Sequence, residues 1–119
     1  MESKDRQVLV KILYETDVIV DILSGYDLGS FLSDEKTKRA SCMTLINIGE
    51  LVKVLSEDFK SSNPDISWRA IAGLRDVTAH RYQTLRMEDI WETCQTDIQL
   101  FKEQLTKMLN LDYVEQGDG

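Results

Sequence analysis

The sequence predicts an all-α protein, on three observations. Apolar residues recur at the spacing of helices almost throughout the chain, and no segment alternates like a strand. The only proline, Pro64, lies in a short polar break. The 119 residues suffice for one domain with a single core. We expect an up-and-down bundle of four main helices with one short extra helical turn.

The first half of the chain predicts two long helices. The first spans Asp5 to Ser24 and ends at Gly25, and a helical turn at 27–32 follows. The second begins near Ser33 or Asp34, continues to about Lys60 and has a point of close approach at Gly49. At ~1.5 Å per residue it would be about 40 Å long, which favours a bundle or a dimer interface. The expected apolar stripes are Leu9, Ile12, Thr16, Ile19 and Leu23, then Phe31 and Leu32 in the turn, then Ala40, Met43, Leu45, Ile46, Leu51, Val54 and Leu55.

The second half predicts two further helices. Ser67 is the expected N-cap of the third, which runs to about His80. A connection at 82–86 leads to the last helix, roughly 87–109. The apolar positions are Trp68, Ile71, Leu74 and Val77 in the third helix, and Ile90, Trp91, Cys94, Ile98, Phe101, Leu105 and Met108 in the last. We expect one domain at 1–110, followed by an acidic, disordered tail at 111–119.

Charge is unevenly distributed along the chain. The formal net charge is -7, yet residues 36–86 carry a net charge of +4. This distribution permits a local RNA or nucleotide site and argues against a broad DNA-binding face. Four arginines of this basic segment lie between Trp68 and the end of the connection: Arg69, Arg75, Arg81 and Arg86.

Composition also bounds the compartment and the cofactors. No uncharged apolar run approaches the ~20 residues that cross a bilayer, and the N-terminus does not resemble a secretory signal, so we expect a cytoplasmic protein without membrane contact. Cys42 and Cys94 match no metal spacing and are interpreted as reduced, partly buried side chains. With His80 as the only histidine, we expect no metal site and no cofactor.

The groups with catalytic potential gather around that histidine. An arginine, a histidine and a tyrosine, Arg75, His80 and Tyr82, can grip a phosphate and move a proton beside it. This chemistry suits RNA cleavage in which a neutral imidazole takes the proton of a ribose 2′-hydroxyl and arginine stabilises the phosphate. Spacing alone fits structural roles better, namely a capping histidine and a salt-bridged arginine.

Helix geometry adds a constraint on this site. Arg75 and His80 are about 140° apart around an ideal helix and ~7.5 Å apart along it, so the two side chains would not meet. They could converge if the helix frays near Ala79, or if a two-fold axis brings a second copy of the segment against the first. Tyr82 would align with Arg75 if the helix continued.

The segment Arg75-Asp76-Val77-Thr78-Ala79-His80-Arg81-Tyr82 resembles the R-x-x-x-x-H-x-Y signature of the HepT-like HEPN ribonuclease toxins. Three further segments resemble that family: Phe31–Thr37, the run Asn47-Ile48-Gly49-Glu50, and Asn63–Arg75. Trp91 lies where the family often has a tryptophan. The likeness covers roughly residues 6 to 109.

The resemblance implies an all-helical homodimer whose two motifs face each other in a cleft and cut RNA without metal. It also implies a type VII-like toxin–antitoxin pair, in which a minimal nucleotidyltransferase antitoxin attaches AMP to the motif tyrosine. By position, Arg75 and His80 become catalytic and Tyr82 becomes the modification site. Asp76 and Glu50 become supporting residues, and Arg69, Arg81, Arg86 and Lys53 become candidate RNA contacts.

The chain departs from the family after the tyrosine. The usual F-G-I-D is replaced by Gln83-Thr84-Leu85-Arg86, which leaves Thr84 as a substitute helix cap, and Ser67 replaces a proline. Two other functions compete with the ribonuclease toxin. One is a non-catalytic substrate-binding subunit of a nucleotidyltransferase, which needs the arginines and not the histidine. The other is a helical dimer that serves only as an interaction scaffold.

Overall fold

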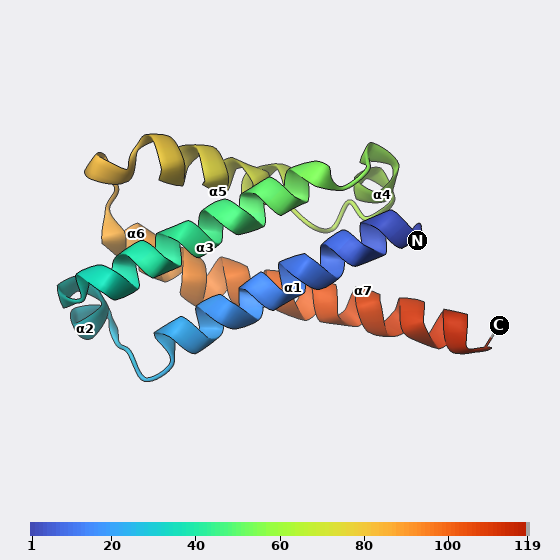
Figure 1. The fold of residues 1–119 in the computed structure, drawn as a ribbon, viewed down its shortest axis with the longest axis horizontal. Coiled ribbons are helices and arrows are strands. Elements are labelled where there is room, and N and C mark those ends of the chain that lie inside the picture. The colour runs from blue at the N-terminus through green and yellow to red at the C-terminus, as the bar shows by residue number, and fades with distance from the viewer. Residues whose placement is uncertain (119) are drawn as a thin grey trace.

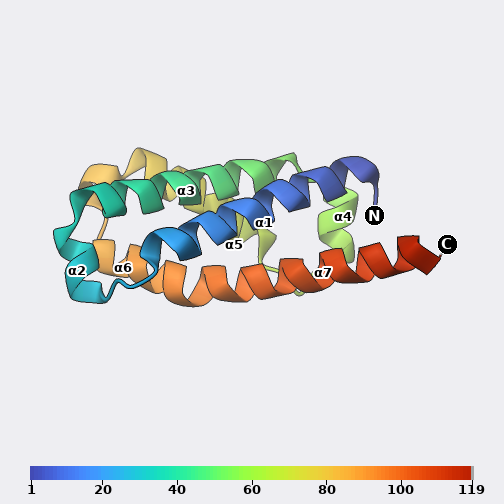
Figure 2. The same ribbon diagram turned by 60° about the horizontal axis from the view of Figure 1, so that its bottom comes forward.

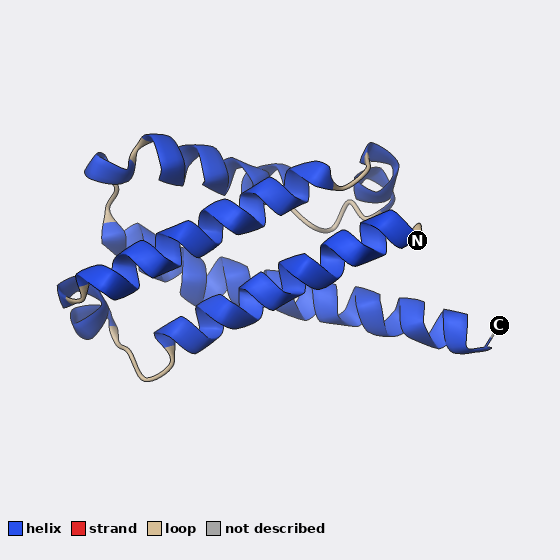
Figure 3. Cartoon of the chain, viewed as in Figure 1, coloured by secondary structure: helices blue, strands red, loops and turns tan. Residues whose placement is uncertain are grey.

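The computed structural model describes the backbone of residues 1–118 and the side chains of residues 1–111. Every regular element in that part is helical, which confirms the all-α prediction, and Figure 3 shows short loops between the helices. The elements are α1 (Ser3–Leu23), α2 (Leu28–Ser33), α3 (Glu35–Val54), α4 (Glu57–Ser62), α5 (Trp68–His80), the 3-10 turn η1 (Tyr82–Thr84), α6 (Met87–Glu92), the π-helical segment η2 (Thr93–Asp97) and α7 (Ile98–Asp118).

The long helices form a layer with one helix beneath it. In Figure 1, α3 lies between α1 and α5, and the turned view of Figure 2 shows α7 running below the layer along α1. The short helices α2 and α6 pack together at one end, and α4 lies at the other end near the N-terminus. No described helix is long and apolar enough to span a bilayer.

The core lies between this layer and α7. The predicted stripe of α1 is buried throughout, and so are most of the expected positions of α6 to α7. Aromatic contacts tie the helices together: the Trp68 ring meets Phe101 edge-on at 5.9 Å between centroids, and Phe59 lies 5.7 Å from Trp68. Phe31 of the predicted helical turn is fully buried and lies 5.3 Å from Trp91.

The expected apolar stripe of the second helix is partly wrong. Met43 and Val54 are 57% and 52% exposed, whereas Ile48 and Val52 are buried instead. The reason is geometric: α3 packs against α1 on one side and α5 on the other, its inner side faces the core, and its outer side faces solvent. The structure therefore leaves apolar side chains on the open side of α3.

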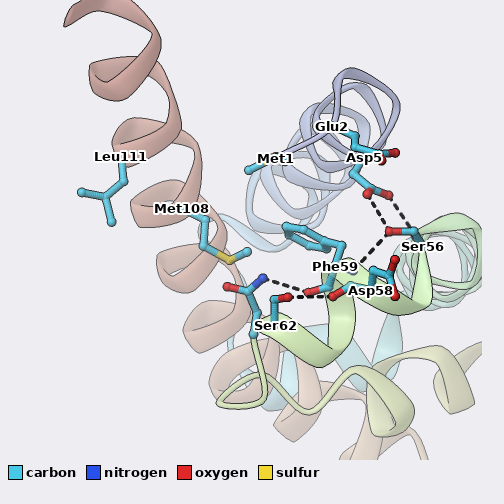
Figure 4. Close-up of a pocket in the computed structure, with 10 residues that line it drawn as sticks. Met1, Glu2, Asp5, Ser56, Asp58, Phe59, Ser62, Met108 and Leu111 are labelled. Atoms are coloured by element: carbon cyan, nitrogen blue, oxygen red, sulfur yellow. Dashed lines mark hydrogen bonds between the residues drawn. The ribbon is translucent and has the colours of Figure 1, made fainter. Parts of the chain in front are cut away.

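The second helix also ends earlier than predicted. It stops at Val54, and α4 begins again at Glu57, with Leu55 in an extended conformation between them. Ser56 caps α4 by accepting a hydrogen bond from the Phe59 amide. The buried Asp5 carboxylate accepts hydrogen bonds from the Ser56 amide (2.9 Å) and hydroxyl (2.7 Å), as Figure 4 shows. These bonds from α1 stabilise the break.

Other boundaries show how the ends of the helices are built. Gly25 has φ +82°, so it closes the first helix as predicted. Ser67 occupies the N-cap position of α5 but makes no side-chain capping bond. Thr84 does not cap the last helix: its hydroxyl donates to the Arg81 carbonyl (3.2 Å), and Arg86 precedes α6.

The last helical stretch contains a π-helical segment, Thr93–Asp97, that the sequence does not predict. The assigned helix α7 extends to Asp118, beyond the expected end near Leu109. The division into a domain at 1–110 and an acidic tail at 111–119 stays a prediction, because the side chains of 112–119 lie outside the described residues.

Candidate active site

Helix α5 carries the arginine, the aspartate and the histidine of the motif, and its first turn is firmly anchored. The Trp68 indole Nε1 donates to the Asn63 carbonyl (3.0 Å), and the ring packs on Phe101. Near the other end, Thr78 is 1% exposed. Arg75 and His80 therefore project from a helix whose own position is fixed by the core.

Gly49 sets how closely α5 approaches α3. A Cβ atom built at Gly49 would lie 2.7 Å from the Arg75 Cβ, 2.9 Å from the Arg75 amide nitrogen and 3.1 Å from the Ala72 carbonyl oxygen. Only a residue without a Cβ fits there, which confirms the predicted close approach. The root of the Arg75 side chain thus rests directly on the backbone of α3.

The guanidinium of Arg75 lies in a chain of alternating charges. Its Nε donates to the Glu50 carboxylate, and its Nη1 donates to Asp76 Oδ1 at 3.3 Å. Lys53 Nζ contacts the same Asp76 oxygen at 3.2 Å. The hydrogen bond from Lys53 lowers the pKa of Asp76, and the hydrogen bond to Glu50 raises the pKa of Arg75. Two helices thereby hold Arg75 charged and oriented.

The bonds to Glu50 and Asp76 leave some N–H donors of Arg75 unused. A guanidinium has five N–H donors, and the two bonds to Glu50 and Asp76 use one each. The side chain is 32% exposed, so the remaining donors can reach a phosphate from solvent. Both predicted supporting residues, Glu50 and Asp76, contact Arg75.

The ring of His80 is oriented by the backbone of its own helix. Its Nδ1 lies 3.1 Å from the Asp76 carbonyl oxygen, one turn earlier. Because a carbonyl oxygen can only accept, Nδ1 must carry the hydrogen in this contact. In the neutral ring the lone pair is then on Nε2. His80 is exposed, so this nitrogen is available as a base at the surface.

The fray that would let Arg75 and His80 converge within one copy is absent. Helix α5 is continuous through His80, and Arg81 is its C-cap. Within one chain the two side chains are therefore held apart around the helix, as an ideal helix predicts. Of the two routes to convergence, the two-fold arrangement is the one compatible with this helix.

Tyr82 does not share the helix face of Arg75. The helix ends at His80, and Tyr82 begins the 3-10 turn η1, where its hydroxyl lies 3.5 Å from Glu35 Oε1. The Arg39 guanidinium lies over the Tyr82 ring, 5.2 Å from its centroid. Glu35 and Glu50, the partners of Tyr82 and Arg75, are about four turns apart on α3. The alignment predicted for a continuing helix is therefore wrong.

The remaining basic residues are spread along α5 and beyond it. Arg69 is exposed in the first turn, whereas Arg81 and Arg86 are exposed after the last. Arg86 lies 3.9 Å from Glu88, and Lys53 is engaged with Asp76. From Arg69 to Arg81 the chain rises about 18 Å, so these side chains are spread out rather than clustered.

The pocket drawn in Figure 4 lies elsewhere. It has a volume of about 420 Å³ and is bounded by the N-terminal end of α1, by α4 and by α7. Its lining includes Asp5, Ser56, Phe59 and Met108, and no residue of the Arg75–His80 site. Asp76 and His80 lie on an open surface of the chain instead.

Neither cysteine belongs to the site. Cys42 and Cys94 are both free and buried, as expected. Burial raises the pKa of the Cys42 thiol to about 11 and that of Cys94 to about 12. Among the described side chains, no group of three or more His, Cys, Asp or Glu is placed to hold a metal ion.

Sequence reasoning missed two residues around Tyr82, Glu35 and Arg39. Their separation of one helical turn is the usual signal of an ion pair, and Arg39 Nε donates to Glu35 Oε1 at 2.9 Å. That signal does not reveal the contact with Tyr82, because Tyr82 belongs to η1, 47 residues after Glu35 in the sequence. Sequence reasoning also missed the pairing of Lys53 with Asp76.

Fold and site together define a small protein, all-helical in its described part, with a partly exposed arginine and an exposed histidine on a helix that packs closely against its neighbour. The family model described as ribonuclease HepT-like matches residues 12–108. The chain belongs to the HepT-like ribonuclease family, and its enzyme class by family is ribonuclease.

Several relatives carry ribonuclease names. A candidate RNase of Methanocaldococcus jannaschii is 39% identical over 93 residues, which is 77% of each chain. A candidate RNase of Caldanaerobacter subterraneus subsp. tengcongensis is 32% identical over 87% of this chain and 93% of its own. A protein of Thermococcus cleftensis named "Probable ribonuclease HepT" is 31% identical over 91% of this chain and 98% of its own. No solved structure matches the chain.

Proposed function

We propose that this chain is the toxin of a toxin–antitoxin pair and an endoribonuclease that cuts RNA by attack of a ribose 2′-hydroxyl, without a metal ion. The observation that carries this proposal is the contact between His80 Nδ1 and the Asp76 carbonyl, which leaves Nε2 free as a base at the surface. The family and the names of the relatives support RNA as the substrate.

The proposed reaction uses the two motif side chains in separate roles. Nε2 of His80 takes the proton of the 2′-hydroxyl, and the 2′-oxygen attacks the adjacent phosphorus. The bond from phosphorus to the 5′-oxygen breaks, and that oxygen takes up a proton from water. The free N–H groups of Arg75 stabilise the charge that develops on the phosphate oxygens. The products are a 2′,3′-cyclic phosphate and a 5′-hydroxyl.

We infer that the complete site forms in a homodimer. Within one chain, the partly exposed Arg75 and the exposed His80 are held apart by a continuous helix. A second copy related by a two-fold axis can supply the facing motif and close the site against water. Each strand of RNA would then meet one arginine and one histidine from opposite copies.

Exposed apolar side chains on α1 and α3 support a self-association surface. We call them the outer face: Val10, Tyr14, Met43 and Val54. Met43 and Val54 are seven and four residues from Glu50, the partner of Arg75, so all three lie on the same side of α3. Val10 and Tyr14 share a shallow pocket with Leu51 of α3. The outer face therefore runs directly past the site.

The antitoxin in this proposal is a minimal nucleotidyltransferase encoded beside the toxin. It would inactivate the chain by attaching AMP to the Tyr82 hydroxyl, which lies two residues past His80. The adduct adds negative charge to the basic segment that attracts RNA. Its phosphate and nucleoside would also occupy the surface beside the histidine.

RNA cleavage in EDTA tests the proposed activity. The purified chain is incubated with a labelled single-stranded RNA, with the same RNA carrying 2′-O-methyl groups, and with DNA of the same sequence. We expect cleavage of the unmodified RNA alone. Cleavage of the methylated RNA or of DNA would contradict the mechanism, and so would loss of activity in EDTA. Tight RNA binding without cleavage would favour the substrate-binding subunit instead.

A further inference from the structure

Tyr82 contacts charged side chains that the proposed nuclease reaction does not use. Its hydroxyl is 3.5 Å from Glu35 Oε1, and its ring is covered by the Arg39 guanidinium. Glu35 is in turn paired with two cations: Arg39 Nε at 2.9 Å and Lys38 Nζ at 3.2 Å. All three charged residues belong to the first turns of α3, whereas the tyrosine comes from η1.

We propose that Glu35, Lys38 and Arg39 form an acceptor site for group transfer to Tyr82, in which Glu35 orients the phenol and the two cations bind the arriving phosphate. This inference rests on the proposed modification of Tyr82 and assigns three residues to it. In the transfer, the Tyr82 oxygen attacks the α-phosphorus of a nucleoside triphosphate held by the partner enzyme. The new bond joins Oη to that phosphorus, pyrophosphate leaves, and the phenol proton passes to Glu35 or to water.

Glu35 is suited to orient the phenol of Tyr82 through a weak hydrogen bond. A contact of 3.5 Å is at the long limit of a hydrogen bond, so the hydroxyl is oriented yet remains available. Pairing with Lys38, the largest contribution, lowers the pKa of Glu35 and keeps the carboxylate ionised as an acceptor. The half-buried position of Tyr82 raises the pKa of its phenol, so the free hydroxyl stays protonated until a transfer enzyme acts on it.

Arg39 can change partner when the phosphate arrives, whereas Lys38 is the less exposed of the two cations, at 19%. Glu35 and Arg39 are 58% and 63% exposed, and exposed ion pairs of this kind are weak. A phosphodiester on Tyr82 presents oxygens that arginine can bind through two N–H groups at once, a stronger contact. The modified tyrosine would therefore draw Arg39 from Glu35, because the hydrogen bond from the phenol to Glu35 is lost when Oη bonds to phosphorus.

The position of this acceptor site links it to the nuclease site. The turn η1 follows directly after His80 and the C-cap residue Arg81. A nucleotide fixed to α3 through Arg39 would anchor the chain immediately after the histidine. The modification would then restrict the movement of His80 as well as block access to it.

The transfer rate to Tyr82 tests this acceptor site. The chain is incubated with the nucleotidyltransferase encoded beside it, ATP and Mg²⁺, and adduct formation is followed by intact-mass spectrometry over a range of chain concentrations up to saturation. We expect Arg39→Ala to slow transfer about tenfold, the effect of losing one bond to a charged group. Arg39→Lys should restore part of the rate. Lys36→Ala, which removes an exposed cation of the same helix outside the acceptor site, should react like the wild type.

The outcomes separate the two proposals. If the wild type gains no adduct, or if Tyr82→Phe gains one, the proposed modification of Tyr82 is wrong. If the wild type is modified at Tyr82 and Arg39→Ala reacts at the same rate, the acceptor site is wrong while the modification stands. A change confined to the apparent KM would show that Arg39 only docks the partner, which also overturns the assignment.

A second measurement needs no partner enzyme. Phosphotyrosine is incorporated at position 82, and its ³¹P signal is titrated in the wild-type background and in Arg39→Ala. Contact with Arg39 and Lys38 favours the dianion, so the second phosphate pKa, ordinarily about 6, should be lower in the wild type. Equal phosphate pKa values in the two backgrounds would overturn the acceptor site.

Discussion

The backbone of Gly49 and the Cβ of Arg75 are in contact, and this contact seats the arginine of the site. No other residue type fits at position 49, since an added Cβ would lie 2.7 Å from the Arg75 Cβ and 2.9 Å from its backbone nitrogen. The neighbouring Glu50 then binds the guanidinium of the same arginine. Two consecutive residues of α3 therefore set both the depth and the direction of one side chain.

Gly49→Ala tests this contact. The added methyl must push α5 away from α3, so we expect a loss of about 1–3 kcal/mol in the free energy of unfolding, as for an overpacked core. Gly73→Ala is the matched control, because a Cβ there meets no atom within 4 Å. In that helix interior alanine should stabilise by about 0.5–1 kcal/mol. Urea denaturation of both variants checks the prediction, and equal effects would contradict it.

Glu50→Gln tests the orientation of Arg75. The amide keeps the shape of the side chain and loses its charge, so the guanidinium is held less firmly. We expect a lower kcat for RNA cleavage with an unchanged helical content. Glu57→Gln, which alters an exposed carboxylate paired with Lys60, should leave kcat unaffected. An unchanged kcat in Glu50→Gln would show that this carboxylate does not position the arginine.

The bonds between Asp5 and Ser56 predict a pH-dependent contribution to stability. Burial opposes ionisation of Asp5, but the two hydrogen bonds from Ser56 outweigh it and lower the pKa below its ordinary 3.8. A lowered pKa stabilises the fold above pH 3.8, and this stabilisation disappears as the pH falls through the folded-state pKa. Asp5→Asn should therefore cost about 1–3 kcal/mol at neutral pH and progressively less in acid. A cost that does not change with pH would contradict the assignment.

The outer face predicts how self-association can be disrupted. Met43→Glu places a charge in the proposed dimer interface, so sedimentation at micromolar concentration should change from a species of twice the 13.7 kDa chain mass to a monomer. RNA cleavage should fall with it. Leu100→Glu is the matched control, because Leu100 of α7 is 56% exposed and lies outside the outer face. A wild-type monomer with full activity would rule out the composite site.

Much of the fold could be predicted because local pattern and tertiary packing agree. The stripe of α1, the turn around Phe31 and the close approach at Gly49 all follow from helical spacing and residue size. The break at Ser56 could not be predicted, because it depends on a carboxylate from the first turn of α1. The helical periodicity of the apolar residues continues across Ser56, so it does not indicate the break.

The geometry of the candidate site could be predicted only in part. The spacing of Arg75 and His80 on one helix is fixed by the sequence, and the structure keeps it. The position of Tyr82 depends on where α5 ends and on which residues of α3 contact η1. Those are tertiary contacts, and a one-dimensional pattern does not contain them. The role of each site residue stays a prediction.

The central claim is that Nε2 of His80 acts as the base in 2′-hydroxyl attack. The most direct measurement compares the wild type with His80→Ala on the same RNA in EDTA and identifies the product ends by ³¹P NMR. We predict a 2′,3′-cyclic phosphate from the wild type and a rate at least about 10²-fold lower in His80→Ala, the usual contribution of a general base. Cleavage by His80→Ala at the wild-type rate, or products without a cyclic phosphate, would contradict the account.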